Sequence, residues 1–194
     1  MKTKLCLLIL LIVGLSVQLS ANPINGLLER IDKGASKKFV IEFKKGADDF
    51  FELDQKGTKV VVRGNNYVNI ATGINWYLKY YAGIQLSWNG MQAKLPQVLP
   101  PVSRKERHET SLSLRYDFNY CTYSYTMAFW DWERWEKEID WMALHGINLP
   151  LAAVGQECIW FNMLQKLGYS KDEINRFIAG PAFLAWWAMN NLEG

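Results

Sequence analysis

The stretch from residue 38 to residue 64 alternates apolar and polar positions in short segments, a pattern typical of half-buried β-strands. "KFVIEFK" and "DFFELDQ" both alternate, and "GTKVVVRGNN" is a β-branched run between turn residues. After residue 66 the apolar spacing becomes helical and ends at Gly83. The apolar face of this predicted helix consists of Ile70, Ile74, Tyr77, Leu78 and Tyr81. With "IQLSW" as a further short strand, the pattern predicts a small antiparallel sheet backed by one helix.

The pattern changes after "KLPQVLPPVSRKERHE", whose prolines and charge run are typical of a linker. "SLSLRYDFNY" begins as a strand, and Asp131 is placed to cap a helix that ends at Gly146. The apolar stripe of this helix consists of Trp132, Trp135, Ile139 and Met142. "INLPLAAV" follows as a strand of the buried type. "ECIWFNMLQKLG" predicts a second helix, and "SKDE" is a capping box that starts a third.

Strands and helices in alternation predict parallel strands joined by helical crossovers. A closed eight-fold β/α barrel takes about 250 residues, whereas this pattern occupies only Ser111 to Gly194. An open pair of buried-type strands leaves its edges unpaired. We therefore expect the chain to be the front part of a longer protein. Residues 22–105 are expected to form a small α/β domain with a linker, and residues 106–194 the first β/α units.

The first residues, "MKTKLCLLILLIVGLSVQLSANP", are typical of a secretory signal, with a basic start, an apolar run and small residues near the end. The alternative is a membrane anchor, but the apolar run is shorter than the roughly 20 residues that a spanning helix needs. We predict a signal peptide over residues 1–21 and export to the periplasm, the medium or the cell surface. No membrane partner is expected after cleavage.

Charge and cysteine usage exclude several functional classes. The formal charge of +3 includes two lysines of the signal, so the remaining chain is almost neutral. Such a chain has no electrostatic reason to bind nucleic acid. Cys121 and Cys158 are too few for a disulfide framework, and Cys121 is expected to be a free thiol. His108 and His145 are isolated, and His145 is placed to cap a helix end, so no metal or cofactor is predicted.

The segment "YDFNYCTYSYTMAFWDWERW", residues 116–135, holds nine aromatic rings in twenty positions. Trp132 and Trp135 belong to the helix stripe and are expected in the core, whereas "NYCTYSYTMAFW" follows the first predicted strand. In parallel β/α folds, ligands bind at the loops after the carboxyl ends of the strands. The first two such loops would bring together Asn119, Tyr125, Gln156 and Glu157. Polar groups beside aromatic faces are suited to a sugar, although aromatic loops also bind peptides and proteins.

The segment "RYDFNYCTYSYTMAFWDWERWEKEIDWMALHGINLPLA", with "GQE" and "GPAFLAWWAMNNL", closely resembles the α-N-acetylglucosaminidases, glycoside hydrolase family 89. "GNNYVNIATGINWYLKYYAGIQLSW" fits the N-terminal domain of the same family. The resemblance implies a small α+β domain followed by the beginning of a (β/α)8 TIM barrel. It implies a retaining exo-hydrolase acting on glycans with terminal α-linked N-acetylglucosamine. By the family motif, the sugar pocket includes Asn119, Cys121 and Tyr125, with Trp186 and Met189 as an apolar wall. Gln156 and Glu157 are added from their position after the second strand.

A catalytic pair is not expected within this chain. A retaining glycosidase needs two carboxyl groups about 5 to 5.5 Å apart, and the resemblance places the family's two glutamates downstream of residue 194. Among the carboxylates present, Asp131 is a predicted cap and Glu157 is better suited to hold sugar hydroxyls than to catalysis. We therefore expect this chain alone to be inactive.

Two other functional classes stay open. One is a non-catalytic carbohydrate-binding module that keeps the aromatic loop without the chemistry. The other is a structural or inhibitory polypeptide with exposed apolar strands. The oligomeric state and the natural glycan are not specified by the sequence.

Overall fold

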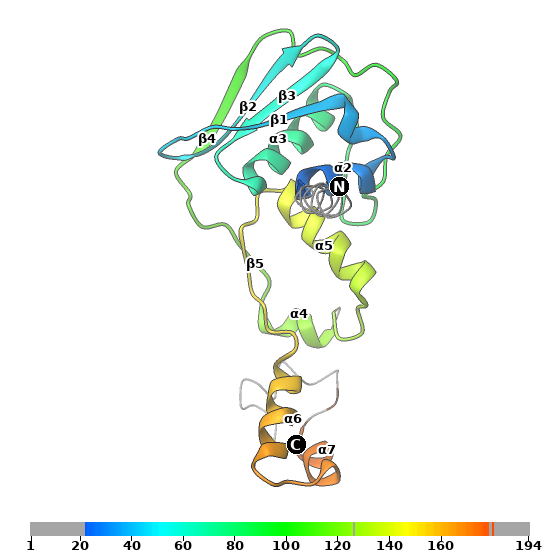
Figure 1. Cartoon of the computed structure of the whole chain (residues 1–194), viewed down its shortest axis with the longest axis vertical. Helices are drawn as coiled ribbons and strands as arrows, with labels where there is room; N and C mark the ends of the chain where they lie inside the picture. The colour runs from blue at the N-terminus through cyan, green and yellow to red at the C-terminus, as the bar shows by residue number, and fades with distance from the viewer. Residues whose placement is uncertain (1–21, 126, 179, 181–194) are drawn as a thin grey trace, which may run out of the picture.

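The computed structural model describes residues 22–125, 127–178 and 180. The signal-peptide prediction and the predicted site residues Trp186 and Met189 therefore lie outside the described residues. We divide the described chain into an N-terminal part, residues 22–110, and a β/α part that begins at residue 111. Figure 1 shows the N-terminal part at one end of an elongated molecule and helices α6 and α7 at the other.

The N-terminal part is a sheet with helices on one face. Its elements, in chain order, are α2 (Pro23–Ile31), a 3₁₀ turn (Ala35–Lys38), β1 (Phe39–Phe43), β2 (Asp49–Lys56), β3 (Lys59–Gly64), α3 (Tyr67–Tyr80) and β4 (Glu106–Thr110). The three strands and the helix predicted between residues 38 and 83 are therefore confirmed, with Asn66 as the N-cap of α3. The sheet order is β1-β3-β2-β4.

The predicted antiparallel arrangement of this sheet is wrong for β1. β2 runs antiparallel to β3 and β4, but β1 pairs in parallel with β3, with Phe39 opposite Val60. The physical reason lies in β3, where Val60, Val61 and Val62 are all buried. A strand buried on both faces belongs in the sheet interior and needs a partner on each side. The β2–β3 hairpin supplies one antiparallel partner. β1 runs opposite to β2 and fills the other side of β3, so it is parallel to β3.

The linker prediction is wrong for residues 106–110. This segment forms β4 and pairs with β2 from Asp49–Thr110 to Leu53–Glu106. The charge run that suggested a linker is suited to an edge strand, where charged side chains discourage pairing with other molecules. "IQLSW", in contrast, forms no strand, because its only pairing is an isolated bridge between Ser87 and Gly90.

Helix α2 was not predicted, because its sequence directly follows the signal. Asn22 accepts a hydrogen bond from the backbone N–H of Ile24, and Pro23 occupies the first turn. The helix buries Ile24, Leu27, Leu28 and Ile31, a helical spacing that was present in the sequence. With α3 it forms one face of the core. Side chains of both helices belong to the same buried apolar cluster.

The core of the N-terminal part is closed and densely packed. The side chains of Leu53, Ile70, Ile74, Tyr77 and Leu78 are fully buried between the sheet and α3. The helix approaches the sheet closely at Gly73, where a Cβ atom would lie 2.9 Å from a methyl group of Val62. The buried Tyr77 hydroxyl donates to the carbonyl of Pro100, 2.6 Å away, which ties the proline-containing segment to the core.

The opposite face of this sheet carries a ladder of charges instead of a second layer of helices. Glu42, Arg63, Glu52 and Arg107 lie opposite one another across the four strands. Glu52 is buried, and Lys44, Lys105 and Arg107 lie within 2.6 to 3.1 Å of its carboxylate. Burial opposes ionisation, but the hydrogen bonds from these cations outweigh it and lower the pKa of Glu52 to about 2.

The β/α part contains two strands and four helices among the described residues. They are β5 (Tyr116–Asp117), α4 (Tyr120–Tyr125), α5 (Trp132–Leu144), β6 (Leu149–Pro150), α6 (Gln156–Lys166) and α7 (Lys171–Phe177). β5 and β6 pair in parallel, as predicted, but each pairs over only two residues. The predicted caps are confirmed, with Asp131 before α5 and the Ser170–Glu173 capping box before α7. His145 and Gly146 end α5, and the backbone of Gly146 has φ +81°.

The predicted apolar core stripe of α5 is wrong for two of its members. Trp132 is 69% exposed and Ile139 is 47% exposed, whereas Met142 is buried. The helix instead directs Glu138 and Asp140 toward the N-terminal part, where Asp140 forms a bidentate ion pair with Arg30 at 2.6 and 2.7 Å. The face of α5 that packs on the N-terminal part therefore combines these polar contacts with Leu144, which is fully buried in the core of that part. Helix α6 has no buried residue at all, so its predicted apolar side is open as well.

No helix among the described residues is long and apolar enough to cross a membrane.

Candidate functional site

The base of the candidate site is fixed by Arg115, directly before β5. Its guanidinium donates to the carboxylate of Asp49 at 2.8 Å and to the amide oxygen of Asn69 at 3.2 Å, both in the N-terminal part. It also donates to the carbonyl of Gly146, at the turn between α5 and β6. The backbone N–H of Arg115 donates to the side chain of Asn148 at 2.8 Å. One side chain thus joins the N-terminal part to the amino ends of both parallel strands.

The chain leaves the carboxyl end of β5 through a constrained backbone. Phe118 has φ 75°, a conformation that is rare for a bulky residue, and its N–H is held by the carboxylate of Asp117 at 2.8 Å. The chain then turns into α4, where Asn119 accepts from the N–H of Thr122 at 3.2 Å. The predicted continuation of the strand to Tyr120 is therefore wrong, because the left-handed residue ends the extended conformation.

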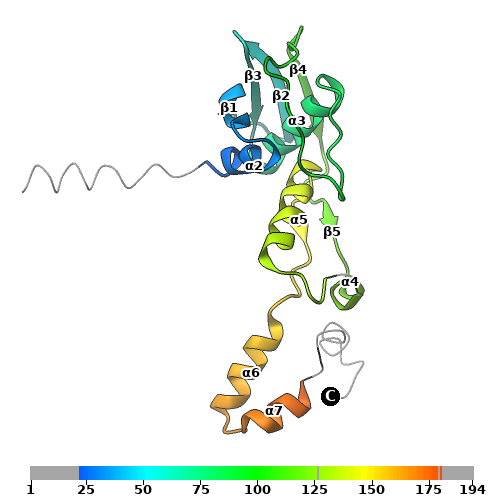
Figure 2. The same ribbon diagram turned by 90° about the vertical axis from the view of Figure 1, so that its right-hand side faces the viewer.

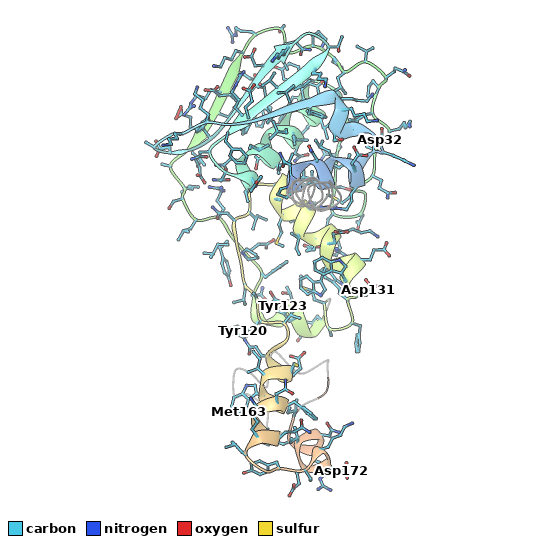
Figure 3. The ribbon with its side chains drawn as sticks, viewed as in Figure 1. Asp32, Tyr120, Tyr123, Asp131, Met163 and Asp172 are labelled. Carbon is cyan, nitrogen blue, oxygen red and sulfur yellow. The ribbon has the colours of Figure 1, made fainter. Side chains whose placement is uncertain are left out.

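The first loop is anchored to the second by a small aromatic cluster. Tyr123 and Met127 are buried, and the Tyr123 hydroxyl donates to the carbonyl of Leu151, just after β6. The Tyr123 ring stacks on Trp135 of α5 with centroids 6.2 Å apart and meets Phe118 edge-on at 5.9 Å. Burial raises the pKa of the Tyr123 hydroxyl, which keeps it protonated as a donor. Figure 3 shows Tyr123 on the short helix α4, close to the chain that leaves β6.

The second loop ends at Gly155, which has φ 87° and is the N-cap of α6. Gln156 and Glu157 therefore lie in the first turn of a helix, where a carboxylate is favoured by the helix dipole. Because β5 and β6 are parallel, their following loops leave the sheet at the same edge. The two loops that hold the predicted site residues therefore start from one edge of the sheet.

The predicted site residues differ in their surroundings. Asn119 is exposed and caps α4, and Tyr125 at the end of that helix is 73% exposed. Cys121 is partly buried and forms no disulfide, and Cys158 is likewise a free thiol. Gln156 and Glu157 are half-buried. Their roles in sugar binding stay a prediction.

A distinct apolar pocket of about 380 Å³ lies beside these loops. It is lined by Phe118, Tyr123, Trp132, Trp135, Ile139, Met142, Pro150, Leu151, Ala152 and Val154. None of the predicted site residues that the structure describes belongs to this lining. The pocket is lined instead by the stripe of α5 that was predicted to be core. Trp132 and Ile139 are therefore exposed to the space of this pocket.

Two carboxylates of the β/α part have local structural roles. Asp117 holds the N–H of Phe118, and Asp131 accepts from the N–H of Arg134 at 2.9 Å. Figure 3 shows Asp131 at the start of α5. Among the described residues, no group of three or more histidine, cysteine or acidic side chains is arranged to hold a metal ion.

Sequence reasoning missed three residues that organise this region, namely Arg115, Phe118 and Tyr123. Arg115 is a single cation before a strand, and nothing in its neighbourhood signals four separate partners. Tyr123 was one ring among nine, and its spacing from Leu151 cannot be read from the sequence. Only the left-handed conformation at Phe118 had a signal, the adjacent Asp117 and Asn119, which are residues common in turns.

Two family models match the chain along most of its length. The α-N-acetylglucosaminidase (NAGLU) N-terminal domain matches residues 22–101, and the α-N-acetylglucosaminidase (NAGLU) TIM-barrel domain matches residues 115–194. The chain belongs to the α-N-acetylglucosaminidase family, glycoside hydrolase family 89. The predicted resemblance and the predicted fold class, a small domain followed by the start of a TIM barrel, are thereby confirmed.

Individual members of this family agree with that assignment. Human α-N-acetylglucosaminidase is 44% identical over 162 residues, which cover 84% of this chain and 22% of the human protein. A family 89 glycoside hydrolase from Clostridium perfringens, solved with 2-acetamido-1,2-dideoxynojirimycin, has a TM-score of 0.83 and 40% identity. That match covers 89% of this chain and 20% of the bacterial one, and a further structure holds GlcNAc-α-1,4-galactose, named as its substrate. The chain thus spans about a fifth of the length of these α-N-acetylglucosaminidases.

Proposed function

We propose that this chain supplies the N-terminal domain and the first β/α units of a retaining exo-glycosidase that removes terminal α-linked N-acetylglucosamine from glycans. The proposal is supported above all by the 44% identity to human α-N-acetylglucosaminidase across both domains. The Clostridium perfringens relative, at 40% identity, is solved with GlcNAc-α-1,4-galactose. The disaccharide carries the α-linked N-acetylglucosamine at the position that an exo-acting enzyme removes.

The proposed part of this chain in the reaction is to bind the sugar. We assign Asn119, Cys121 and Tyr125 to the loop after β5, and Gln156 and Glu157 to the start of α6. Tyr123 holds the first loop against the second through Leu151, so the positions of both sets depend on this hydroxyl. Trp186 and Met189 complete the proposed pocket as an apolar wall. The chemistry needs two carboxyl groups about 5 to 5.5 Å apart, and we propose that neither belongs to this chain.

The chain alone is therefore proposed to lack turnover. The test is hydrolysis of an aryl α-N-acetylglucosaminide by the purified polypeptide, with Glu157→Gln as the control for background. We expect equal and negligible rates. A rate that Glu157→Gln abolishes would overturn the proposal and make Glu157 a catalytic residue.

The activity of the whole enzyme is tested by a chimera. Residues 22–194 replace the matching fifth of the Clostridium perfringens hydrolase, and GlcNAc-α-1,4-galactose is the substrate. We expect hydrolysis, with the α-anomer of N-acetylglucosamine appearing first in NMR spectra, because a retaining mechanism preserves the configuration. A folded chimera that binds the disaccharide without cleaving it would instead favour the carbohydrate-binding module.

Export is proposed as well, on the sequence of residues 1–21 alone. Mass spectrometry of the exported protein should find a mature N-terminus between about residues 17 and 25. Intact Met1 in the membrane fraction would contradict cleavage.

A further inference from the structure

A groove lies at the junction of the two parts, and its lining contains no residue of the loops that follow β5 and β6. It encloses about 410 Å³ between the turn at residues 88–92 and helix α5. Its lining consists of Trp88, Asn89, Gly90, Met91, Gln92, Arg134 and Lys137. Both its volume and its position between two domains are typical of ligand-binding sites. Figure 2 shows α5 directly against the N-terminal part at this level.

The aromatic surface of this groove is held in a fixed orientation. The indole N–H of Trp88 donates to the buried carboxylate of Glu138 at 2.7 Å, and the Arg134 guanidinium lies 4.9 Å from the centre of the Trp88 ring. Arg134 also lies 3.8 Å from the centre of the Trp130 ring, so the guanidinium contacts both indoles. Trp88 nevertheless remains 44% exposed. A rigid, exposed indole contributes binding surface without the entropy cost of ordering a side chain.

The charges of the groove are already balanced. Arg134 pairs with Glu138 at 2.8 Å, and Lys137 pairs with Glu133 at 2.9 Å. An anionic ligand would have to compete with these carboxylates, so the groove does not favour one. Asn89 and Gln92, both exposed, add amide donors and acceptors beside the indole. Amides next to a flat apolar ring are suited to a neutral ligand with several hydroxyl groups.

The groove continues beyond Trp88. A second hollow of about 300 Å³ shares Met91, Gln92 and Lys137 with the first and extends to Arg30 and Glu136. A ligand that follows both hollows is longer than one sugar ring.

We propose that this groove is a second glycan-binding site, which takes a neutral oligosaccharide with one ring on Trp88. The site goes beyond the proposed hydrolysis, because its lining contains no residue of the loops after β5 and β6 and no proposed catalytic group. Binding there can succeed or fail independently of turnover.

The test is calorimetric titration of the purified chain with chitotriose, a neutral oligosaccharide without an α-linkage. We expect saturable binding that Trp88→Ala weakens about tenfold or more, because the stacking surface is lost. Trp88→Ala also removes the bond to Glu138, so Gln92→Ala is the second variant. It leaves that bond intact and should weaken binding about two- to tenfold through one lost hydrogen bond.

The matched control is Trp132→Ala on helix α5, which removes another exposed tryptophan ring that does not line the groove. Binding should stay unchanged in this variant. Absence of chitotriose binding, or binding that survives both Trp88→Ala and Gln92→Ala, would overturn the proposal. Loss of binding only in Tyr125→Ala would assign the sugar to the loop after β5. If an anionic hyaluronan tetrasaccharide bound more tightly than chitotriose, the proposal that the groove takes a neutral ligand would be refuted.

Discussion

The two parts of the chain contain similar numbers of apolar residues but bury them to different extents. In the N-terminal part, the apolar faces of β2, β3, α2 and α3 meet one another, and their large side chains are almost all buried. Among the described residues of the β/α part, Tyr123 and Met127 form a small buried cluster with their partly buried neighbours, and Leu144 is buried against the N-terminal part. Trp132, Ile139 and Ile159 are exposed there. Apolar residues at helical spacing are therefore buried only where other segments of this chain pack against them.

The difference follows from topology. A four-stranded sheet with two helices closes its core through neighbouring segments of one short chain. In a β/α barrel, each helix packs on the outside of a ring of eight strands, and the described residues supply only β5 and β6. The contrast can be tested by substitutions in both parts.

The largest effect is expected for Leu53→Ala in the N-terminal part. Leu53 is fully buried, so the substitution should lower the free energy of unfolding by about 2–5 kcal/mol through lost burial and a cavity. The matched variant is Ile159→Ala on α6, where the side chain is 71% exposed, and the expected change is below about 0.5 kcal/mol. Urea denaturation of both variants measures the difference. Equal destabilisation would contradict the contrast between the two parts.

The next effect concerns the charged face of the same sheet. The pKa of Glu52 is lowered to about 2, so its contribution is complete above about pH 5 and is lost as the pH falls toward 2. Glu52→Gln should lower the free energy of unfolding at pH 7 by about 2 kcal/mol. This value is smaller than the full pKa shift would give, because solvent screens the partly exposed lysines. Near pH 2.5 the variant and the wild type should differ little.

Urea denaturation at the two pH values gives this comparison. Glu133→Gln is the control, since Glu133 is a highly exposed partner of Lys137 on α5. A constant difference between Glu52→Gln and the wild type across the pH range would show that packing, not ionisation, is responsible.

These two regions also show what a sequence can predict. Strands β1 to β3, helix α3, the cap at Asp131 and the capping box at Ser170 follow from local patterns, and all were predicted. β4 was missed because its charges resemble those of a linker, and their partner Glu52 lies on a strand about 55 residues earlier. The parallel pairing of β1 was missed because strand order depends on non-local contacts.

The candidate site was predicted only as far as the loops that follow the two parallel strands. The position of a loop follows from the order of strands and helices. The contact between Tyr123 and Leu151, in contrast, joins two loops and depends on the geometry between them. Arg115 likewise acts through Asp49 and Asn69, which belong to another domain.

A smaller effect is expected for Tyr123→Phe. The ring keeps its contacts with Phe118 and Trp135, and only the hydrogen bond to the carbonyl of Leu151 is lost. The free energy of unfolding should fall by about 0.5–1.5 kcal/mol. In the chimera, the Michaelis constant should rise as well, because the two loops lose their connection. A loss of stability with an unchanged Michaelis constant would show that the Tyr123 hydroxyl contributes to packing alone.

The smallest effect on stability is expected for Tyr125→Phe, which separates pocket rings from core rings. Tyr125 is 73% exposed, so the melting temperature should hardly change. If its hydroxyl binds the sugar more tightly in the transition state, kcat/KM of the chimera should fall, because this interaction contributes to rate and not to folding. A lost hydrogen bond of about 1–3 kcal/mol corresponds to roughly a five- to hundredfold decrease. Tyr123→Phe is the matched control, since it removes the same atom from a buried ring of the same helix. A Tyr125→Phe chimera that is destabilised yet kinetically normal per folded molecule would remove Tyr125 from the sugar site and return the aromatic segment to a role in packing.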